Sequence, residues 1–126
     1  VTVVCAGGGG IPVIRRGDGR LEGIEAVIDK DRAAGLLATA LDADAFLMLT
    51  DVAAVYRNWG TPSQTAIREI GPDEIDPADF PPGSMAPKVD AARSFSSRPG
   101  RIAGIGRLED ASAILAGEAG TRILTR

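Results

Sequence analysis

Hydrophobic positions follow two different periods along this chain. Residues 1–6 and 45–49 are continuous apolar runs, which are typical of strands buried on both faces of a parallel sheet. Residues 29–41 and 84–97 instead repeat apolar side chains at the spacing of one helix face. The pattern predicts three further elements in the last part of the chain, a strand, a helix and a strand, over 101–105, 108–116 and 121–125.

This alternation of strands and helices indicates an α/β fold with a mainly parallel sheet and helices on both faces. A chain of 126 residues with 44% hydrophobic content can build one core, so we expect a single domain over 1–126. Residue 1 already lies in a predicted core strand. We therefore expect the fold to be truncated at its N-terminus.

Capping residues set the bounds of the two longer helices. Asp29 offers an N-cap oxygen to the first, and Ser84 to the second, where Pro87 is tolerated in the first turn. The predicted packed face of the first helix comprises Ala33, Leu36, Leu37, Ala40 and Leu41. That of the second comprises Met85, Val89, Ala92 and Phe95.

The remaining segments are rich in turn residues. Residues 13–28 predict a hairpin around the turn Gly17-Asp18-Gly19, because Asp-Gly is a favoured tight-turn pair. Residues 55–58 predict a short strand and 72–80 a helical turn broken by proline, with a loop between them.

Composition excludes several classes of function. The net charge is −3 and no basic run exceeds the pair Arg15 and Arg16, which argues against a nucleic-acid partner. The apolar stretches fall short of the roughly 20 residues that span a bilayer, so we expect no membrane partner and a cytoplasmic location. Cys5, the single cysteine, lies in an apolar run and is expected to be a small core residue.

Lys30 and Lys88 are the most informative polar residues. Each lies near the start of a predicted helix, where the macrodipole disfavours a cation unless an anion offsets it. Two helix starts with a lysine each would suit a polyphosphate. The alternative is that both lysines are simply solvated.

Gly8, Gly9 and Gly10 follow the first predicted strand and could let the backbone approach a phosphate, although a plain turn explains them equally well. They form neither a dinucleotide-binding fingerprint nor a P-loop. The chain has no histidine, which removes the commonest general base. Chemistry here would rest on positioning and charge, as phosphoryl transfer does.

Two carboxylates and two aromatics complete the candidates. Asp51 ends a buried strand and could orient a lysine or a magnesium-bound water, while Asp31 could hold Lys30; either could equally be a cap. Tyr56 and Trp59 could border an adenine ring or belong to the core. No metal-ligating residue is predicted.

Five strings in order along the chain resemble carbamate kinases, which belong to the amino-acid kinase superfamily: GGGGIPVI, GIEAVIDKD, LTDVAAVYRNWG, PPGSMAPK and GTRI. The resemblance implies a three-layer αβα sandwich around a mainly parallel sheet, usually in a homodimer. It also implies reversible phosphoryl transfer between ATP or ADP and a small acceptor, carbamate, with Mg²⁺ accompanying the nucleotide.

Within that family the C-terminal half binds the nucleotide, and this chain matches that half. The resemblance implies that Lys30, Lys88 and Asp31 are catalytic, and that Gly8, Gly9 and Gly10 form a substrate or phosphate loop. The nucleotide-binding residues that it implies are Asp51, Val52, Ala54, Tyr56, Met85, Pro87 and Lys88.

The chain departs from the family pattern in three ways. The N-terminal half is absent, Ala86 replaces a glycine, and Ala53 replaces an aspartate. One alternative is therefore a non-catalytic fragment that binds ADP or ATP. Another is a different amino-acid kinase, acting on acetylglutamate, glutamate or UMP, against which the NWG and GSMAPK strings argue.

Overall fold

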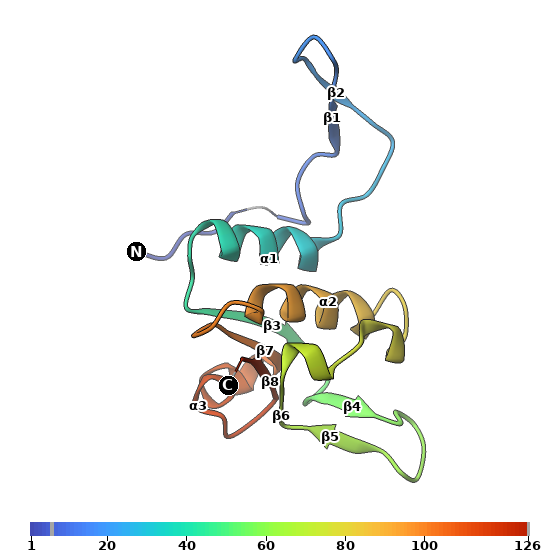
Figure 1. Ribbon diagram of the computed structural model, residues 1–126, viewed down its shortest axis with the longest axis vertical. Helices are drawn as coiled ribbons and strands as arrows, with labels where there is room; N and C mark the ends of the chain where they lie inside the picture. Colours follow the sequence, from blue (N-terminus) through green and yellow to red (C-terminus); the bar gives the residue numbers. More distant parts are fainter. Residues whose placement is uncertain (6, 126) are drawn as a thin grey trace.

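A four-stranded sheet lies at the centre of the structure, a computed structural model that describes residues 1–5 and 7–125 (Figure 1). The strand order is β3-β7-β8-β6. β3 (Ala45–Thr50) runs parallel to β7 (Ile102–Arg107), and β6 (Glu69–Ile70) runs parallel to β8 (Thr121–Leu124). β8 is antiparallel to β7, which the pattern of apolar residues did not predict. The expected α/β fold is confirmed, with a sheet of mixed direction.

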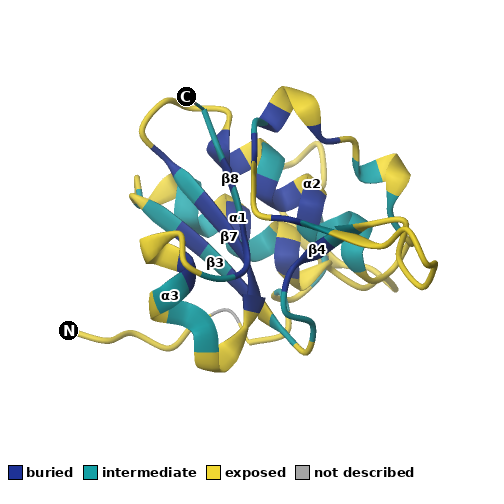
Figure 2. Cartoon of the chain, turned by 90° about the horizontal axis from the view of Figure 1, so that it is seen from below, coloured by how far each residue is buried: buried dark blue, intermediate teal, exposed yellow. Residues whose placement is uncertain are grey.

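Helices cover both faces of this sheet (Figure 2). α2 (Met85–Ser96) packs on one face and α1 (Lys30–Ala40) packs on α2, while α3 (Ala111–Ala116) packs on the other face after the 3₁₀ turn η3 (Leu108–Asp110). Gly104 of β7 permits the close approach of α3. A Cβ there would lie 2.6 Å from Cγ2 of Ile114 and 2.5 Å from Cδ2 of Leu47.

The core forms between α2 and the sheet. Val89 and Ala92 are fully buried, as predicted for the packed face of this helix. Phe95 is 1% exposed, and its ring meets Phe46 of β3 edge-on, with the ring centroids 5.6 Å apart. The sheet contributes three further fully buried side chains, those of Ala103, Ile105 and Ile123.

The predicted packed face of α1 is wrong. Leu36 and Leu41 are 66% and 71% exposed, and the helix instead buries Asp31 and Gly35. A Cβ on Gly35 would lie 3.6 Å from Cβ of Ala91 on α2. α1 thus approaches another helix through small residues, which turns the leucine side of the helix outward. The N-cap is confirmed, because Oδ1 of Asp29 accepts a hydrogen bond from the Arg32 amide at 2.8 Å.

The predicted N-terminal strand is also wrong for the residues that the structure describes. Residues 1–5 have no regular secondary structure, and Val1, Val3 and Val4 are exposed. Cys5 is exposed as well, so it is not a core residue. A buried strand requires hydrogen-bonding neighbours, and residues 1–5 belong to none of the strand ladders. Residue 6 lies outside the described residues.

Two hairpins extend from the packed layers. β1 (Val13–Arg15) and β2 (Leu21–Gly23) form the predicted one, which projects away from the body (Figure 1). Its turn carries an ion pair between Arg16 and Glu22, and this guanidinium lowers the pKa of the Glu22 carboxyl. β4 (Val55–Arg57) and β5 (Thr65–Ile67) form the second and make a separate two-stranded sheet.

The loop predicted after residue 58 is therefore only partly correct, because β5 and β6 interrupt it. Strands of two or three residues are too short to produce a readable alternation of apolar and polar positions. The helical turns predicted over 72–80 are present as η1 (Pro72–Glu74) and η2 (Pro77–Asp79). Among the described residues, no helix is both long and apolar enough to cross a membrane.

Candidate functional site

A cavity of about 350 Å³ opens where β3 and β4 meet the start of α2. Its walls come from three parts of the chain: the start of α1, the segment that runs from β3 through the tip of the second hairpin, and the segment that leads into α2. The lining residues are Lys30, Thr50, Asp51, Val52, Ala54, Tyr56, Trp59, Phe80, Pro81, Gly83, Ser84, Met85 and Lys88. The cavity lies beside the carboxyl end of β3, where open α/β sheets bind ligands.

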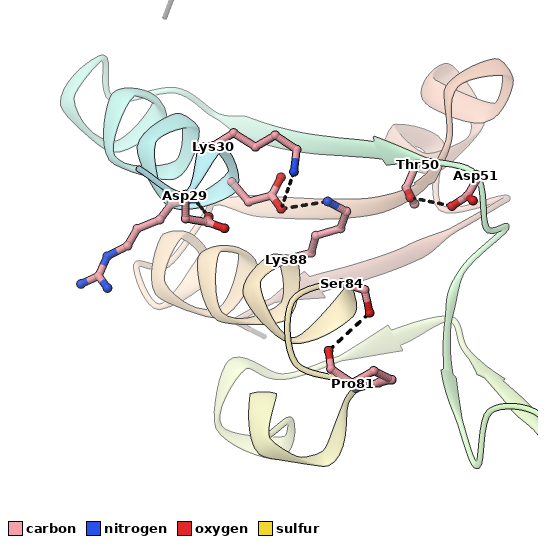
Figure 3. A network of polar contacts seen from close by, with 9 residues as sticks. Asp29, Lys30, Thr50, Asp51, Pro81, Ser84 and Lys88 are labelled. Carbon is pink, nitrogen blue, oxygen red and sulfur yellow. Dashed lines mark hydrogen bonds and ion pairs between the residues drawn. The ribbon is translucent and has the colours of Figure 1, made fainter. Parts of the chain in front are cut away.

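Two lysines from different helices meet at one carboxylate in this site. Nζ of Lys88 lies 2.8 Å from Oδ2 of Asp31, and Nζ of Lys30 lies 3.9 Å from the same oxygen. Figure 3 shows both ammonium groups extending from α1 and α2 into the space between the helices. The side chains of Lys88 and Asp31 are only 13% and 11% exposed, whereas that of Lys30 is 66% exposed. The alternative of a simply solvated lysine is therefore excluded for Lys88, whereas the Lys30 side chain is largely exposed to solvent.

The start of α2 adds partial positive charge to the same wall. Ser84 occupies the N-cap position, but its side chain makes no cap hydrogen bond to the helix. Its Oγ instead donates to the carbonyl of Pro81 at 3.4 Å, as Figure 3 shows. Ser84 and Met85 both line the cavity, so the positive end of the helix dipole borders the space that the lysines face. An anionic ligand would be stabilised here.

Another part of the cavity wall is aromatic. The rings of Tyr56 and Trp59 lie 5.2 Å apart, and both side chains line the cavity together with Phe80. Trp59 is 56% exposed, so it is not a core residue. A cavity with an aromatic wall and a cationic wall matches the two ends of a nucleotide, a base and a phosphate chain.

Asp51 follows β3 directly and contributes a carboxylate to the cavity. The hydroxyl of Thr50 donates to Oδ1 of Asp51 at 3.0 Å (Figure 3). Across residues 1–5 and 7–125, no group of three or more Cys, Asp or Glu side chains is placed to hold a metal ion. Asp51 could therefore contact a cation only together with other ligands, such as phosphate oxygens.

Five of the predicted site residues are not among those that line this cavity. Asp31 is one of them, and it lies behind the two lysines that it contacts. Pro87 lines a neighbouring groove, with Asp29 and Arg32. Gly8, Gly9 and Gly10 precede the first hairpin, and Gly9 adopts a φ of +124° where a Cβ would lie 2.8 Å from the carbonyl oxygen of Ile28. This close approach to the residue before the α1 cap gives Gly9 a structural role.

The segment before α2 contributes residues that were not predicted from the sequence to belong to the site. Phe80, Pro81, Gly83 and Ser84 line the cavity, as does Thr50. A usable signal was present in the sequence, because the string PPGSMAPK contains three of these residues as well as Lys88. Gly83 adopts a φ of +77°, which favours glycine and turns the chain into the helix.

Replacing Asp31 by asparagine should lower the free energy of unfolding by about 1–3 kcal/mol, because Lys88 loses its partner in a poorly solvated position. Urea denaturation of the purified chain measures this change. Asp29→Asn is the matched control, since asparagine caps helices as well as aspartate, and it should shift stability by less than about 0.5 kcal/mol. Equal effects of the two substitutions would show that the Asp31–Lys88 pair contributes nothing specific.

Comparison with known proteins places this geometry in a family. The sequence profile of the Amino acid kinase family matches residues 2–106. The carbamate kinase of Haemophilus influenzae is 50% identical over 121 residues, which are 96% of this chain and 39% of that protein. The carbamate kinase of Escherichia coli K12 is 51% identical with the same coverage of both.

Solved structures agree. The carbamate kinase from Giardia lamblia bound to AMP-PNP superimposes with a TM-score of 0.92 at 40% identity, covering 100% of this chain and 45% of that one. The chain thus spans about 40% of the length of the curated relatives that it matches. With a profile match over most of its length and a fold that superimposes closely, this chain belongs to the amino acid kinase family.

Proposed function

We propose that the cavity binds ATP or ADP, and that the protein containing this chain is a carbamate kinase, which transfers a phosphoryl group reversibly between ATP and carbamate. The observation that carries the proposal is the convergence of Lys30 and Lys88, from two helices, at a cavity that aromatic side chains also line. The identity of about 50% to carbamate kinases supports the choice of acceptor.

The cationic wall and the aromatic wall bind different parts of the nucleotide. Lys30, Lys88 and the start of α2 face the phosphate chain, while Tyr56 and Trp59 face the base. Asp31 holds the ammonium group of Lys88 at 2.8 Å, so this lysine is positioned before a ligand arrives, and Lys30 lies 3.9 Å from the same oxygen. Phosphoryl transfer needs such preorganised charge, because its transition state spreads negative charge over the equatorial oxygens.

Mg²⁺ fits this site as an ion bound mainly by the nucleotide. Among the residues that line the cavity, Asp51 provides the one carboxylate. Mg²⁺ in nucleotide sites usually keeps water and phosphate ligands and takes only one or two carboxylates from the protein. When bound, the ion would neutralise phosphate charge, and Asp51 is the residue that would orient it. The homodimer expected from the resemblance stays a prediction.

A non-catalytic nucleotide-binding module is the second candidate function. The identity of about 50% to carbamate kinases does not favour it over the catalytic reading. A different amino-acid kinase is not favoured, since the relatives with about 50% identity are carbamate kinases.

Titration of the purified chain with ADP tests nucleotide binding directly. Trp59 is the only tryptophan in the sequence and lines the cavity, so its fluorescence reports on ligand binding there. We expect a saturable change in emission, and at least about tenfold tighter binding of ADP than of AMP, because AMP lacks the β-phosphate that the lysines would contact. Calorimetry provides an independent affinity. Absence of binding by both methods would refute the proposal.

Catalysis is tested in a chimera in which this chain replaces the matching segment of the Haemophilus influenzae carbamate kinase. ATP formation from ADP and carbamoyl phosphate is followed with a coupled assay. We expect the chimera to form ATP, and the chain alone to bind ADP without forming ATP. These results would support the proposal that the chain is the nucleotide-binding half of a carbamate kinase. A chimera that folds and binds ADP but forms no ATP would instead favour the non-catalytic module.

A further inference from the structure

The aromatic wall of the cavity is carried by a hairpin that is not part of the main sheet. β4 and β5 pair only with each other in the described strand ladders, and the main sheet contains β3, β7, β8 and β6. Tyr56 lies in β4, and Trp59 lies in the turn that follows it. The position of the wall relative to the lysines therefore depends on how this hairpin is attached to the sheet.

Thr121 contributes to that attachment through its hydroxyl, next to a backbone hydrogen bond from the Arg122 amide to the Arg68 carbonyl at 2.9 Å. Its Oγ1 accepts a hydrogen bond from the Val55 amide at 2.8 Å and donates one to the carbonyl of Ile67. One residue of β8 thus binds the first strand and the second strand of the hairpin at the same level, since Val55 and Ile67 are paired in the β4–β5 ladder. Thr121, Val55 and Ile123 are all fully buried, so water does not replace these bonds readily.

The tip of the hairpin is ordered by its own contacts. The Thr61 hydroxyl donates to the carbonyl of Asn58 at 2.8 Å, and the Gly60 amide donates to Oε1 of Gln64 at 2.9 Å. Trp59 lies between these bonded positions, and its ring is 5.2 Å from Tyr56. Because the tip is rigid, a displacement at the base of the hairpin moves the tip and its two rings together.

We propose that Thr121 is a positioning residue for the nucleobase: it sets the distance between the aromatic wall on the β4–β5 hairpin and the lysine wall on α1 and α2. The inference rests on the proposed nucleotide function. It places Thr121 outside the cavity, where it touches no ligand and acts through Val55 and Ile67. It also predicts that Thr121 affects binding of the base and leaves binding of the phosphates intact.

Thr121→Val tests the inference, because valine keeps the shape of threonine but leaves the Val55 amide and the Ile67 carbonyl unpaired. Calorimetric titrations use ADP and inorganic tripolyphosphate, which carries the phosphates without a base. We expect Thr121→Val to weaken ADP binding by about 5- to 10-fold, as partial loss of base stacking would, and to change tripolyphosphate binding by less than about 2-fold. Thr121→Ser, which keeps the hydroxyl, should bind ADP like the unmodified chain.

A double-mutant cycle with Trp59→Ala separates positioning from a general structural effect. If Thr121 acts through the hairpin, Thr121→Val should weaken ADP binding in the unmodified chain but by less than about 2-fold in the Trp59→Ala background. Circular dichroism confirms that each variant is folded at the temperature used. Should Thr121→Val not fold, Thr121→Ala replaces it, since a water molecule can occupy the vacated space and bond to both backbone groups.

Three results would overturn the inference: unchanged ADP affinity in Thr121→Val, equal loss of ADP and tripolyphosphate affinity, or additive effects with Trp59→Ala. Failure of the proposed function looks different, because the unmodified chain would then bind neither ADP nor tripolyphosphate.

Discussion

Turnover should fall by at least about 100-fold when Lys88 is replaced by alanine in the chimera with the Haemophilus influenzae carbamate kinase. Lys88 is 13% exposed, so its ammonium group acts where water screens charge poorly. It also borders the cavity next to the start of α2. Loss of this donor removes stabilisation that the transferring phosphoryl group needs most in the transition state.

The measurement is the initial rate of ATP formation from ADP and carbamoyl phosphate at saturating substrate. Arg98→Ala is the matched control, because it removes a cation at the far end of α2, where the side chain is exposed. Its rate should stay within about 2-fold of the unmodified chimera. We expect Lys30→Ala to lower turnover by a factor similar to that for Lys88→Ala. Near-normal turnover of Lys88→Ala in a folded chimera would refute the assigned role.

Folding must be checked alongside, because Lys88→Ala also removes the partner of Asp31. The remaining cation near that carboxylate is Lys30, at 3.9 Å and largely exposed. A double substitution, Asp31→Asn with Lys88→Met, removes both charges and avoids a buried carboxylate without a partner. If the double variant regains stability but not turnover, local unfolding does not explain the catalytic loss.

Phe95→Ala should destabilise the chain by about 3–5 kcal/mol, which is a large fraction of the stability of a small domain. Phe95 is 1% exposed and packs edge-on against Phe46. Its ring also lies 5.1 Å from Cζ of Arg101, a buried cation that pairs with Asp42. Truncation therefore leaves a cavity and removes a cation–π contact as well.

Urea denaturation of the purified chain, followed by far-ultraviolet circular dichroism, measures this effect. Leu36→Ala is the control, since it also shortens an apolar side chain on a helix, but one that is 66% exposed. It should change stability by less than about 0.5 kcal/mol. A large decrease in the free energy of unfolding from Leu36→Ala would show that the face predicted for α1 from the sequence pattern is packed after all. A small decrease in the free energy of unfolding from Phe95→Ala would show that Phe95 is not central to the core.

Local signals in the sequence were sufficient for the helices and for the type of chemistry. Asp29 caps α1 as predicted, and the apolar spacing identified the buried face of α2, because capping and helical periodicity depend on residues within one or two turns. Lys30 and Lys88 stood out for the same reason, as cations near helix starts. The strings that resemble carbamate kinases pointed to the family that the profile and the structures then showed.

Other features depend on residues that are distant in the sequence. Leu36 of α1 faces outward because Gly35 meets Ala91 on another helix, a contact that no periodicity within α1 encodes. The apolar run at the N-terminus reads as a buried strand, yet residues 1–5 have no ladder partner among the described strands. Strand burial is decided by neighbours, so the pattern of one segment cannot establish it.

The sequence by itself thus determined the two longer helices, the Asp29 cap and the two lysines near helix starts, since each depends on neighbours a few residues away. The cap predicted from Ser84 did not form, because its hydroxyl bonds to Pro81 instead. Only the tertiary structure decided that Asp31 and Lys88, 57 positions apart, form one ion pair, and that Thr121 holds Val55 across 66 positions. Such contacts form only after the intervening chain has been ordered. The conformational entropy lost in that ordering is offset by packing of the whole core. The geometry of the site is therefore a property of the packed fold and not of any single motif.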